Sequence, residues 1–449
     1  MELIWDLGFG IWDLEFVFML PDLIEIVPLD KPVHAEITVP GSKSITNRAL
    51  VLAALADGEV TLQGALWSED TQVMVDCLQR LGFEVRVERD PNEFCNRTIM
   101  VRGRGGEIPN AGTVEKPLEL FVGNAGTAAR FLSALVCLGR GVYRLSGVPR
   151  MHERPQAALF GALRELGYQV ESSNKLPAVI HGTGPLAGKC RVSIEESSQF
   201  ASALLLCTER SGWQIEVVDE NAEESPYVEM TKQLVGVFPK DSRKFIIEPD
   251  SSSGSYIWAA SWLFTDSTMQ PQPSGLGHLF RVKDWPLSDW QIDTEFPKFL
   301  RTQSNVSRTH DLGDSIMTAI VIASFGPKPI RFTDLGRLRV QECERVVALR
   351  TELTKCGAKV IEIGDTLEVY PSQLHGAEIE TYNDHRMAMC FAVLGLKVPG
   401  IKLRNPSCVK KTFPNFFQKL AAAPPHGLGV TILDARSGRK LSHDELFAD

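Results

Sequence analysis

The ten residues LQRLGFEVRV, 78–87, carry the pattern on which the fold of the chain is built. Apolar residues first recur at helical spacing, a glycine follows, and apolar and polar residues then alternate as in a strand. The same pattern returns in LRELGYQVES (163–172) and LTKCGAKVIE (353–362). In the three copies the helix ends at Gly82, Gly167 and Gly357, and glycine adopts the left-handed conformation of such an end at little cost. The repeat predicts an α/β (α+β) architecture built by duplication of helix–strand–hairpin units.

The composition is typical of a soluble globular protein. Its 449 residues suffice for two or three domains, 44% of them are hydrophobic, and 23% are charged. A net charge of -9 argues against a nucleic-acid or anionic-membrane partner. The nine cysteines stand singly, which is typical of reduced thiols in a cytoplasmic protein, and the nine histidines form no zinc-type cluster.

Three stretches divide the chain. Residues 1–18 contain no Lys or Arg and so lack the positive region of a signal peptide, and we expect them to be an extension before a working start at Met19. VPGSKS (39–44) and EPDSSSGS (248–255) are candidate crossings between domains. The crossings predict one domain from residues 42–248 and a second, discontinuous domain from residues 19–41 plus 249–449. Between residues 265 and 311 the periodicity is lost, and no secondary structure is assigned there.

PGSKSITNRAL, residues 40–50, is the first candidate for anion binding. Ser42 is a suitable N-cap, and Lys43, Ser44 and Arg48 stand in the first turns of the helix that follows. The free amides and the positive dipole of a helix start favour an anion there. A P-loop is excluded, because Ser42 stands where a P-loop has the glycine before its lysine. Taken alone, the stretch fits an ordinary capped helix equally well.

Similar helix starts follow along the chain. They are GNAGTAARFLSALV (123–136) with Thr127 and Arg130, ESSQFASALLL (196–206) with Ser197, Ser198 and Gln199, RVQECERVVALRTEL (339–353) with Glu342 and Arg345 on one helical face, and YNDHRMAMCFAVLGL (382–396) with Asp384 as cap before His385 and Arg386. Each alone is typical of ordinary caps and surface ion pairs, and Asp314 alone would be an ordinary N-cap. Together they predict a cleft for a ligand with several negative groups.

In this order the motifs resemble those of the EPSP synthase family, the 3-phosphoshikimate 1-carboxyvinyltransferases. The blocks that carry the resemblance are PGSKSITNRAL, GNAGTAARFL, GVPRMHERP, SSQFASALLL, EPDSSSGSY, GDSIMTA, RVQECER, TYNDHRMAM and KKTFPNFF, between residues 40 and 417. The resemblance implies a two-domain enolpyruvyl transferase fold, with each domain built from three repeated βαβαββ-type units as an inside-out α/β barrel. It also implies a monomer without metal or organic cofactor that acts on small anionic substrates.

The reaction implied by the resemblance joins phosphoenolpyruvate to the 5-hydroxyl of shikimate 3-phosphate and releases phosphate. It makes Asp314 the base that takes the hydroxyl proton and Glu342 the acid that protonates the enol methylene, with Lys43 beside both substrates. Cleft closure and substrate charge are then expected to raise the pKa of Glu342. Fixed cations would stabilise the charge that moves to phosphate.

The same resemblance implies two sets of binding residues. Shikimate 3-phosphate would be bound by Lys43, Ser44, Arg48, Ser197, Ser198, Gln199, Tyr227, Asp314, Arg337 and Gln341. Phosphoenolpyruvate would be bound by Lys43, Asn124, the amide of Gly126, Arg150, Gln199, Glu342, Arg345, His385, Arg386 and Lys411. Thr127 and Arg130 would line the same cleft.

Phe131, where the family commonly has Pro, and the region 265–311 depart from the family pattern, and three further departures concern the contacts to shikimate 3-phosphate. Gln341 stands where the family usually has Lys, Arg337 where it commonly has Asn, and Glu224 where it usually has Ser. Arg337 and Gln341 are four residues apart and so would be neighbours if the helix extends back that far. We expect Arg337 to supply the charge that Gln341 lacks. Because Glu224 beside a substrate anion would be unfavourable, we expect Ser225 or a shifted loop to serve in its place.

Two alternatives stay open at this point. UDP-N-acetylglucosamine enolpyruvyltransferase shares the fold and the donor, but its acid is a loop cysteine, and SGVPRMHERP (146–155) contains none. A weakened paralogue that binds shikimate 3-phosphate without turnover would account for Gln341 and Glu224. The residues that argue against the paralogue are Lys43, Asp314, Glu342, Arg345 and Arg386.

Overall fold

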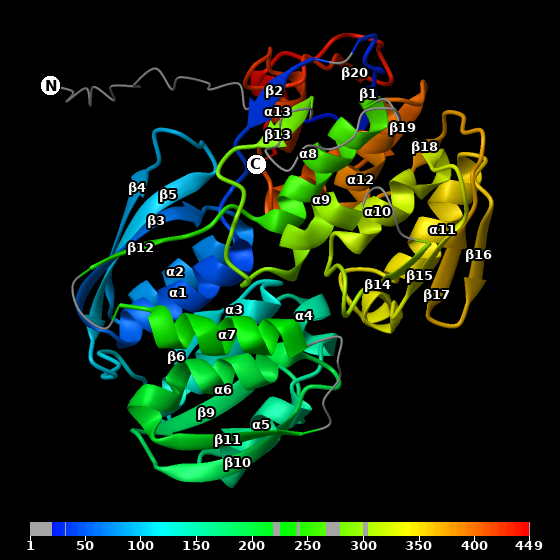
Figure 1. Ribbon diagram of the computed structural model, residues 1–449. Coiled ribbons are helices and arrows are strands. Elements are labelled where there is room, and N and C mark those ends of the chain that lie inside the picture. Colours follow the sequence, from blue (N-terminus) through cyan, green and yellow to red (C-terminus); the bar gives the residue numbers. More distant parts are fainter. Residues whose placement is uncertain are drawn as a thin grey trace, which may run out of the picture.

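The computed structural model describes residues 20–31, 33–218, 225–239, 243–265, 279–299 and 304–448. The chain forms two lobes, each around its own hydrophobic core (Figure 1). One core consists of residues between Ile45 and Ile247, and we call the described residues 42–248 the inserted lobe. The other combines residues from Leu20 to Val39 with residues from Tyr256 onward and belongs to the outer lobe. The expected start at Met19 and the departure at Glu224 lie outside the described residues.

Four sheets share one strand-pairing pattern, in which one parallel pair is followed by two antiparallel pairs. The first sheet of the inserted lobe has the strand order β12 (Lys244–Ile246), β3 (Asp57–Leu66), β5 (Asn96–Arg104), β4 (Glu84–Arg89). Its second sheet has the order β6 (Leu118–Phe121), β7 (Arg140–Ser146), β9 (Ala178–Thr183), β8 (Gln169–Glu171). The first sheet of the outer lobe has the strand order β14 (Asn305–Ser307), β15 (Ile330–Thr333), β17 (Thr366–Val369), β16 (Val360–Ile363). Its second sheet has the order β18 (Glu378–Ile379), β19 (Ile401–Arg404), β1 (Leu23–Ile26), β20 (Ile432–Asp434). Each lobe adds one parallel pair, β10 (Gly188–Ser193) with β11 (Trp213–Val218) and β13 (Phe280–Val282) with β2 (Ala35–Ile37).

The repeat predicted from the sequence is confirmed. The helices α2 (Glu69–Arg80), α5 (Ala157–Glu165) and α11 (Arg345–Lys355) each precede an edge strand of one of these sheets. Gly82, Gly167 and Gly357 end them with φ of 88°, 92° and 88°, the left-handed conformation expected. Three copies of one local sequence pattern therefore build three equivalent helix–strand–strand units.

The other helices of each lobe pack against one another and against the sheets, which lie on the periphery (Figure 1). Those of the inserted lobe are α1 (Lys43–Leu55), α3 (Gly126–Leu135), α4 (Pro149–Glu153), α6 (Ser198–Ser211) and α7 (Ser225–Val237). Those of the outer lobe are α8 (Ser251–Phe264), α9 (Phe296–Phe299), α10 (Ile316–Ile322), α12 (His385–Gly395) and α13 (Phe416–Ala421). Short 3-10 turns are η1 (Val136–Leu138), η3 (Ile292–Glu295), η4 (Ala323–Phe325), η5 (Gly336–Val340), η6 (Pro406–Lys411) and η7 (Asp444–Leu446). All eleven residues of α12 are buried, which explains its nearly continuous apolar sequence.

The two predicted crossings between the lobes lie side by side. Gly41 forms an isolated bridge with Pro249, the amide of Ser42 donates to the carbonyl of Glu248, and the amide of Asp250 donates to that of Pro40. Gly41 is required there, because a Cβ would lie 1.9 Å from the carbonyl oxygen of Gly64. The division into two domains at these crossings stays a prediction, which the separate cores support.

A buried polar cluster joins the lobes beside the crossings. Glu93, in the turn before β5, accepts from Asn415 at 2.7 Å and pairs with Lys419 at 2.6 Å, and both partners belong to the outer lobe. Its carboxylate also accepts from Thr38, three residues before Gly41. The carboxylate is therefore fully partnered although it is buried.

The region 265–311, left unassigned from sequence, is described at residues 279–299 and 304–311. Its elements are short: β13, η3, α9 and β14 have three or four residues each. Elements this short show no measurable periodicity in sequence. In the described part of the chain the longest helices, α6 and α8, have fourteen residues, and no helix is long and apolar enough to span a bilayer.

Candidate active site

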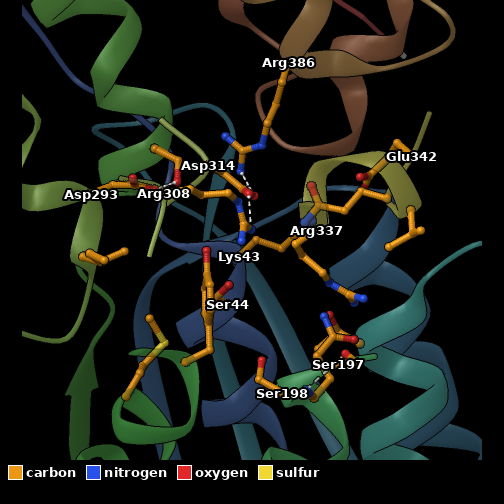
Figure 2. Close-up of a pocket in the computed structure, with 18 of the residues that line it drawn as sticks. Lys43, Ser44, Ser197, Ser198, Asp293, Arg308, Asp314, Arg337, Glu342 and Arg386 are labelled. Atoms are coloured by element: carbon orange, nitrogen blue, oxygen red, sulfur yellow. Dashed lines mark hydrogen bonds and ion pairs between the residues drawn. The ribbon is translucent and has the colours of Figure 1, made fainter. Parts of the chain in front are cut away.

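A cavity of about 640 Å³ lies between the lobes and is lined by both (Figure 2). It is lined by most of the residues predicted to bind or react: Lys43, Ser44, Arg48, Thr127, Arg130, Ser197, Ser198, Gln199, Tyr227, Asp314, Arg337, Gln341, Glu342, Arg345, His385 and Arg386. Arg154, Asp293 and Arg308 line it as well. Side chains from the starts of α1, α6 and α12 thus meet at one place.

The inserted lobe contributes two helix starts. Helix α1 begins at Lys43, whose Nζ lies 3.4 Å from Asp70, while the buried guanidinium of Arg48 donates to Thr231 at 2.7 Å and Ser202 at 3.0 Å. Burial lowers the pKa of Arg48 to about 10. At the second start Ser197 caps α6 by accepting from the amide of Gln199. Hydroxyls and amides at such starts are ready donors for an anion.

Asp314 faces three arginines of the outer lobe. Its carboxylate lies 3.0 Å from Arg386, 3.3 Å from Arg308 and 3.9 Å from Arg345 (Figure 2). Burial opposes its charge, but Arg386, Arg345 and Arg308 outweigh this effect and hold the pKa of Asp314 well below its usual range. Asp314 is therefore ionised in the free site, where the same arginines make it a weaker base than an ordinary carboxylate.

Glu342 lies between two cations. Lys411 donates to Oε1 at 3.0 Å, and Arg345 lies 2.9 Å from Oε2. Burial again opposes the charge, but Lys411 and Arg345 hold the pKa of Glu342 well below its usual range. For Glu342 to donate a proton, an anion must first draw these cations away or add its own negative charge.

Asp384 fixes the third helix start. Its carboxylate caps α12 by accepting from the amide of Arg386 and also accepts from Nε of Arg345 at 2.7 Å, so the predicted cap is confirmed. His385 is buried next to it, and burial together with Arg386 holds the pKa of His385 well below its usual value. At neutral pH His385 is therefore uncharged.

The comparisons with known proteins agree with this geometry. Residues 29–239 and 297–420 match the family model described as EPSP synthase (3-phosphoshikimate 1-carboxyvinyltransferase). The chain belongs to the EPSP synthase family. It is similar to the 3-phosphoshikimate 1-carboxyvinyltransferases of Trichormus variabilis (37% identity over 89% of this chain and 98% of the relative) and Opitutus terrae (37%, 90% and 97%). Its fold is similar to that of a solved EPSP synthase from Acinetobacter baumannii, with a TM-score of 0.72 at 19% identity, covering 91% and 99% of the two chains.

Four residues predicted from the EPSP synthase pattern lie outside the cavity lining, and three of them lie against residues that line it. The carbonyl of Asn124 accepts from Arg154 at 3.2 Å, and a Cβ on Gly126 would lie 2.6 Å from the same guanidinium. Lys411 reaches the cavity through Glu342. The fourth, Arg150, is not brought to the site.

The assignment of Arg150 to this site is contradicted by the structure. Its side chain is 53% exposed and pairs with Glu153 at 2.5 Å. Helix α4 is only five residues long and ends before Arg154, whose side chain turns into the cavity instead. In this member of the EPSP synthase family the motif GVPRMHERP thus places its second arginine, and not its first, at the site.

The segment before α11 also differs from the prediction. Glu342 and Arg345 form the expected pair, but α11 begins only at Arg345, so Glu342 is not on the helix. For the same reason Arg337, in η5, and Gln341 are not successive positions of one helix. Gln341 instead accepts a hydrogen bond from Arg345. The chain bends at residues 341–343, between η5 and α11, with φ of -88° and ψ of -132° at Gln341.

Two residues of the site carried no sequence signal. Arg308 follows the three-residue strand β14, and Asp293 lies in the 3-10 turn η3. Both are buried, with 2% and 3% of their surface exposed. Their elements are too short to reveal by periodicity which side chains face inward.

Proposed function

We propose that the protein transfers the enolpyruvyl group of phosphoenolpyruvate to the 5-hydroxyl of shikimate 3-phosphate and releases phosphate. The observation that carries this proposal is that Asp314 and Glu342 face one cavity together with Lys43, Arg345 and Arg386. Membership of the EPSP synthase family and relatives named for this reaction over nearly their whole length support it. Both substrates are polyanions of the kind that such a cationic cavity favours. Because both lobes of one chain complete the cavity, a monomer suffices.

The binding roles follow from the two walls of the cavity. Shikimate 3-phosphate would lie against the inserted lobe, with Arg337 reaching it from the outer lobe; its partners there would be Lys43, Ser44, Arg48, Ser197, Ser198, Gln199 and Tyr227. Phosphoenolpyruvate would lie between Arg154, Arg345, Arg386 and Lys411, with Arg154 in the role first expected of Arg150. Gln199 accepts from Arg130 at 2.5 Å and lies where both substrates would meet.

The chemistry has two halves. In the first, the 5-hydroxyl oxygen would bond to C2 of phosphoenolpyruvate as Asp314 takes its proton and Glu342 gives a proton to C3. In the second, the bond from C2 to the phosphate oxygen would break as Asp314 passes its proton to the departing phosphate, and the Glu342 carboxylate would take a proton back from C3, which restores the double bond. Arg345, Arg386 and Lys411 would stabilise the charge on the departing phosphate.

The electrostatics of the free site support this sequence of events. Arg345 and Arg386 hold Asp314 ionised, and Arg345 and Lys411 do the same for Glu342. When phosphoenolpyruvate engages these cations, the field on Glu342 weakens and the substrate adds negative charge. Both effects raise the pKa of Glu342, so binding itself would prepare the acid.

Phosphate release from the two substrates together, with mass detection of the enolpyruvyl product, tests the proposal. The expected result is equal amounts of phosphate and product, neither of which appears when one substrate is omitted. Calorimetric binding of shikimate 3-phosphate without phosphate release would instead support the weakened paralogue. Release that requires UDP-N-acetylglucosamine in place of shikimate 3-phosphate would overturn the proposal.

Replacing each arginine of GVPRMHERP by alanine in turn tests which of the two binds phosphoenolpyruvate. Arg154→Ala should lower kcat/KM for phosphoenolpyruvate about 10- to 100-fold, because a charge-assisted contact of a half-buried guanidinium that lines the cavity is lost. Arg150→Ala is the matched control and should stay within about twofold, because Arg150 makes an exposed i,i+3 pair. Steady-state kinetics that show the reverse order would restore the original assignment.

Arg337→Ala tests whether Arg337 replaces the missing lysine. The KM for shikimate 3-phosphate should rise about tenfold, because the cavity loses a cation where Gln341 already lacks one. The double variant Arg337→Asn/Gln341→Lys, which restores the usual family pair, should recover most of this loss. Arg331→Ala, an exposed arginine of β15, serves as control. An unchanged KM in Arg337→Ala would refute the compensation.

A further inference from the structure

Asp293 has a place in the cavity wall that neither the sequence nor the proposed chemistry explains. It lies in η3, is 3% exposed, and lines the cavity beside Asp314. A buried carboxylate is costly unless hydrogen bonds satisfy its oxygens. The hydrogen-bond donors around Asp293 therefore indicate its role.

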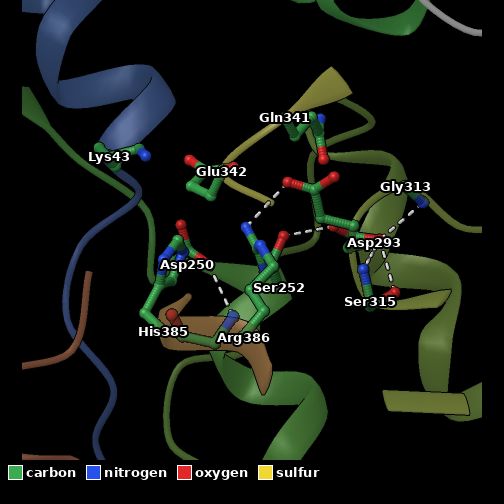
Figure 3. Close-up of polar contacts among 12 residues, drawn as sticks. Lys43, Asp250, Ser252, Asp293, Gly313, Ser315, Gln341, Glu342, His385 and Arg386 are labelled. Atoms are coloured by element: carbon green, nitrogen blue, oxygen red, sulfur yellow. Dashed lines mark hydrogen bonds and ion pairs between the residues drawn. The ribbon is translucent and has the colours of Figure 1, made fainter. Parts of the chain in front are cut away.

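Four donors converge on this one carboxylate (Figure 3). Oδ1 accepts from the amide of Gly313 at 2.7 Å, from the amide of Ser315 at 3.2 Å and from the hydroxyl of Ser315 at 2.5 Å. Oδ2 accepts from the hydroxyl of Ser252 in the first turn of α8. The two amides belong to the residues immediately before and after Asp314, so Asp293 holds the backbone on both sides of the proposed base.

Gly313 allows this close approach. A Cβ there would lie 2.8 Å from Cγ2 of Ile292 and 3.2 Å from each carboxylate oxygen of Asp293. The first of these distances is closer than van der Waals contact permits, so any other residue would push the turn away from Asp293. Only glycine at position 313 therefore allows the turn to approach the carboxylate of Asp293 this closely.

The same short segment reaches the crossing between the lobes. Gln291, two residues before Asp293, donates to the carbonyl of Pro249 at 2.9 Å and accepts from the amide of Ser251 at 3.1 Å. Residues 291–293 therefore link the turn that carries Asp314 to the point where the chain enters the outer lobe.

We propose that Asp293 is a positioning residue, which holds the turn 313–315 so that the carboxylate of Asp314 points at the substrate hydroxyl. This inference rests on the proposed function. Asp293 takes no proton in the reaction, and its contribution is geometric. A base displaced by about 1 Å loses on the order of 10²-fold in rate, whereas binding through the arginines and lysines is little affected.

Asp293→Asn is the direct test. An amide nitrogen in place of Oδ1 would remove the three hydrogen bonds of the turn 313–315, and one in place of Oδ2 would remove the bond from Ser252. In either orientation the negative charge that strengthens the remaining bonds is lost. We expect kcat for phosphate release to fall about 10- to 100-fold while the KM for phosphoenolpyruvate stays within about twofold. A kcat within twofold of wild type, or a loss confined to KM, would overturn the proposal.

A control and a second variant separate positioning from general destabilisation. Glu445→Gln removes another buried carboxylate with several donors, Arg439 and Ser442, far along the chain in η7, and should leave kcat unchanged. If Asp293→Asn does not fold, Gly313→Ala moves the same turn while keeping the carboxylate. It should reproduce the fall in kcat with unchanged KM, and a normal kcat would count against the proposal.

A crystal structure of Asp293→Asn tests the positioning without any turnover. The expected result is a shift of residues 313–315 and of the Asp314 carboxylate relative to Arg386. An unchanged turn would overturn the inference even if the wild type releases phosphate. A wild type that releases no phosphate would refute the proposed function alone, because the shift of the turn is measured independently.

Discussion

Replacement of Asp314 by Asn should lower kcat about 10²- to 10⁴-fold, the range expected when a general base is removed. The amide has nearly the shape of the carboxylate but cannot take the proton of the 5-hydroxyl. The substitution removes the negative charge that pairs with Arg386, Arg308 and Arg345. These arginines would remain to attract the phosphate and carboxylate groups of the substrates. The KM values should therefore stay the same or fall. Steady-state phosphate release and calorimetric titration with each substrate measure the two effects.

Asp311→Asn is the matched control for this experiment. Asp311 lies three residues earlier, in the preceding turn, and its carboxylate accepts from the amide of Ser307 at 2.8 Å without lining the described cavity. Its loss should change stability slightly and kcat by less than about twofold. If Asp314→Asn and Asp311→Asn had equal activities, Asp314 could not be the base.

Glu342→Gln should have an effect of similar size, about 10²- to 10⁴-fold in kcat, because no proton is then available for C3. Lys411 and Arg345 lose the carboxylate that they share, so phosphoenolpyruvate should bind at least as well as in wild type. A second readout comes from reactions in D₂O. The wild type should transfer deuterium to C3 and leave part of it in the product methylene, whereas Glu342→Gln should transfer almost none during the same time.

Glu344→Gln controls for damage to α11. Glu344 caps that helix by accepting from the amide of Val347 at 2.6 Å and pairs with Arg339, outside the cavity. The variant should lower the melting temperature slightly and keep deuterium transfer. Deuterium transfer by Glu342→Gln at the wild-type rate would exclude Glu342 as the acid.

The sequence predicted those parts of the molecule that local residues determine. The three helix–strand units follow from periodicity and from Gly82, Gly167 and Gly357, all of which act within about ten residues. The cap Asp384 was predictable for the same reason, since a cap bonds to an amide two positions away. Ser42 stands at the predicted N-cap position of α1, but its side chain makes no cap hydrogen bond.

The sequence could not predict contacts that depend on the packing of distant segments. Arg150 and Arg154 are both arginines near a helix start, and only the end of the one-turn helix α4 decides which of them enters the cavity. Glu342 was predicted on a helix that begins three residues later. Asp293 and Arg308 are placed by turns and three-residue strands, for which sequence offers no period.

The bridge between Gly41 and Pro249 holds the two ends of residues 42–248 together, so the chain leaves the outer lobe and returns to it at one place. A gene for that stretch alone would encode a fragment with adjoining ends, and the remaining chain could be rejoined there without a spacer. Each fragment would carry one wall of the cavity. Anionic substrates that bind between the two walls would favour the assembled state over the separate fragments. Association of the fragments should therefore increase with substrate concentration.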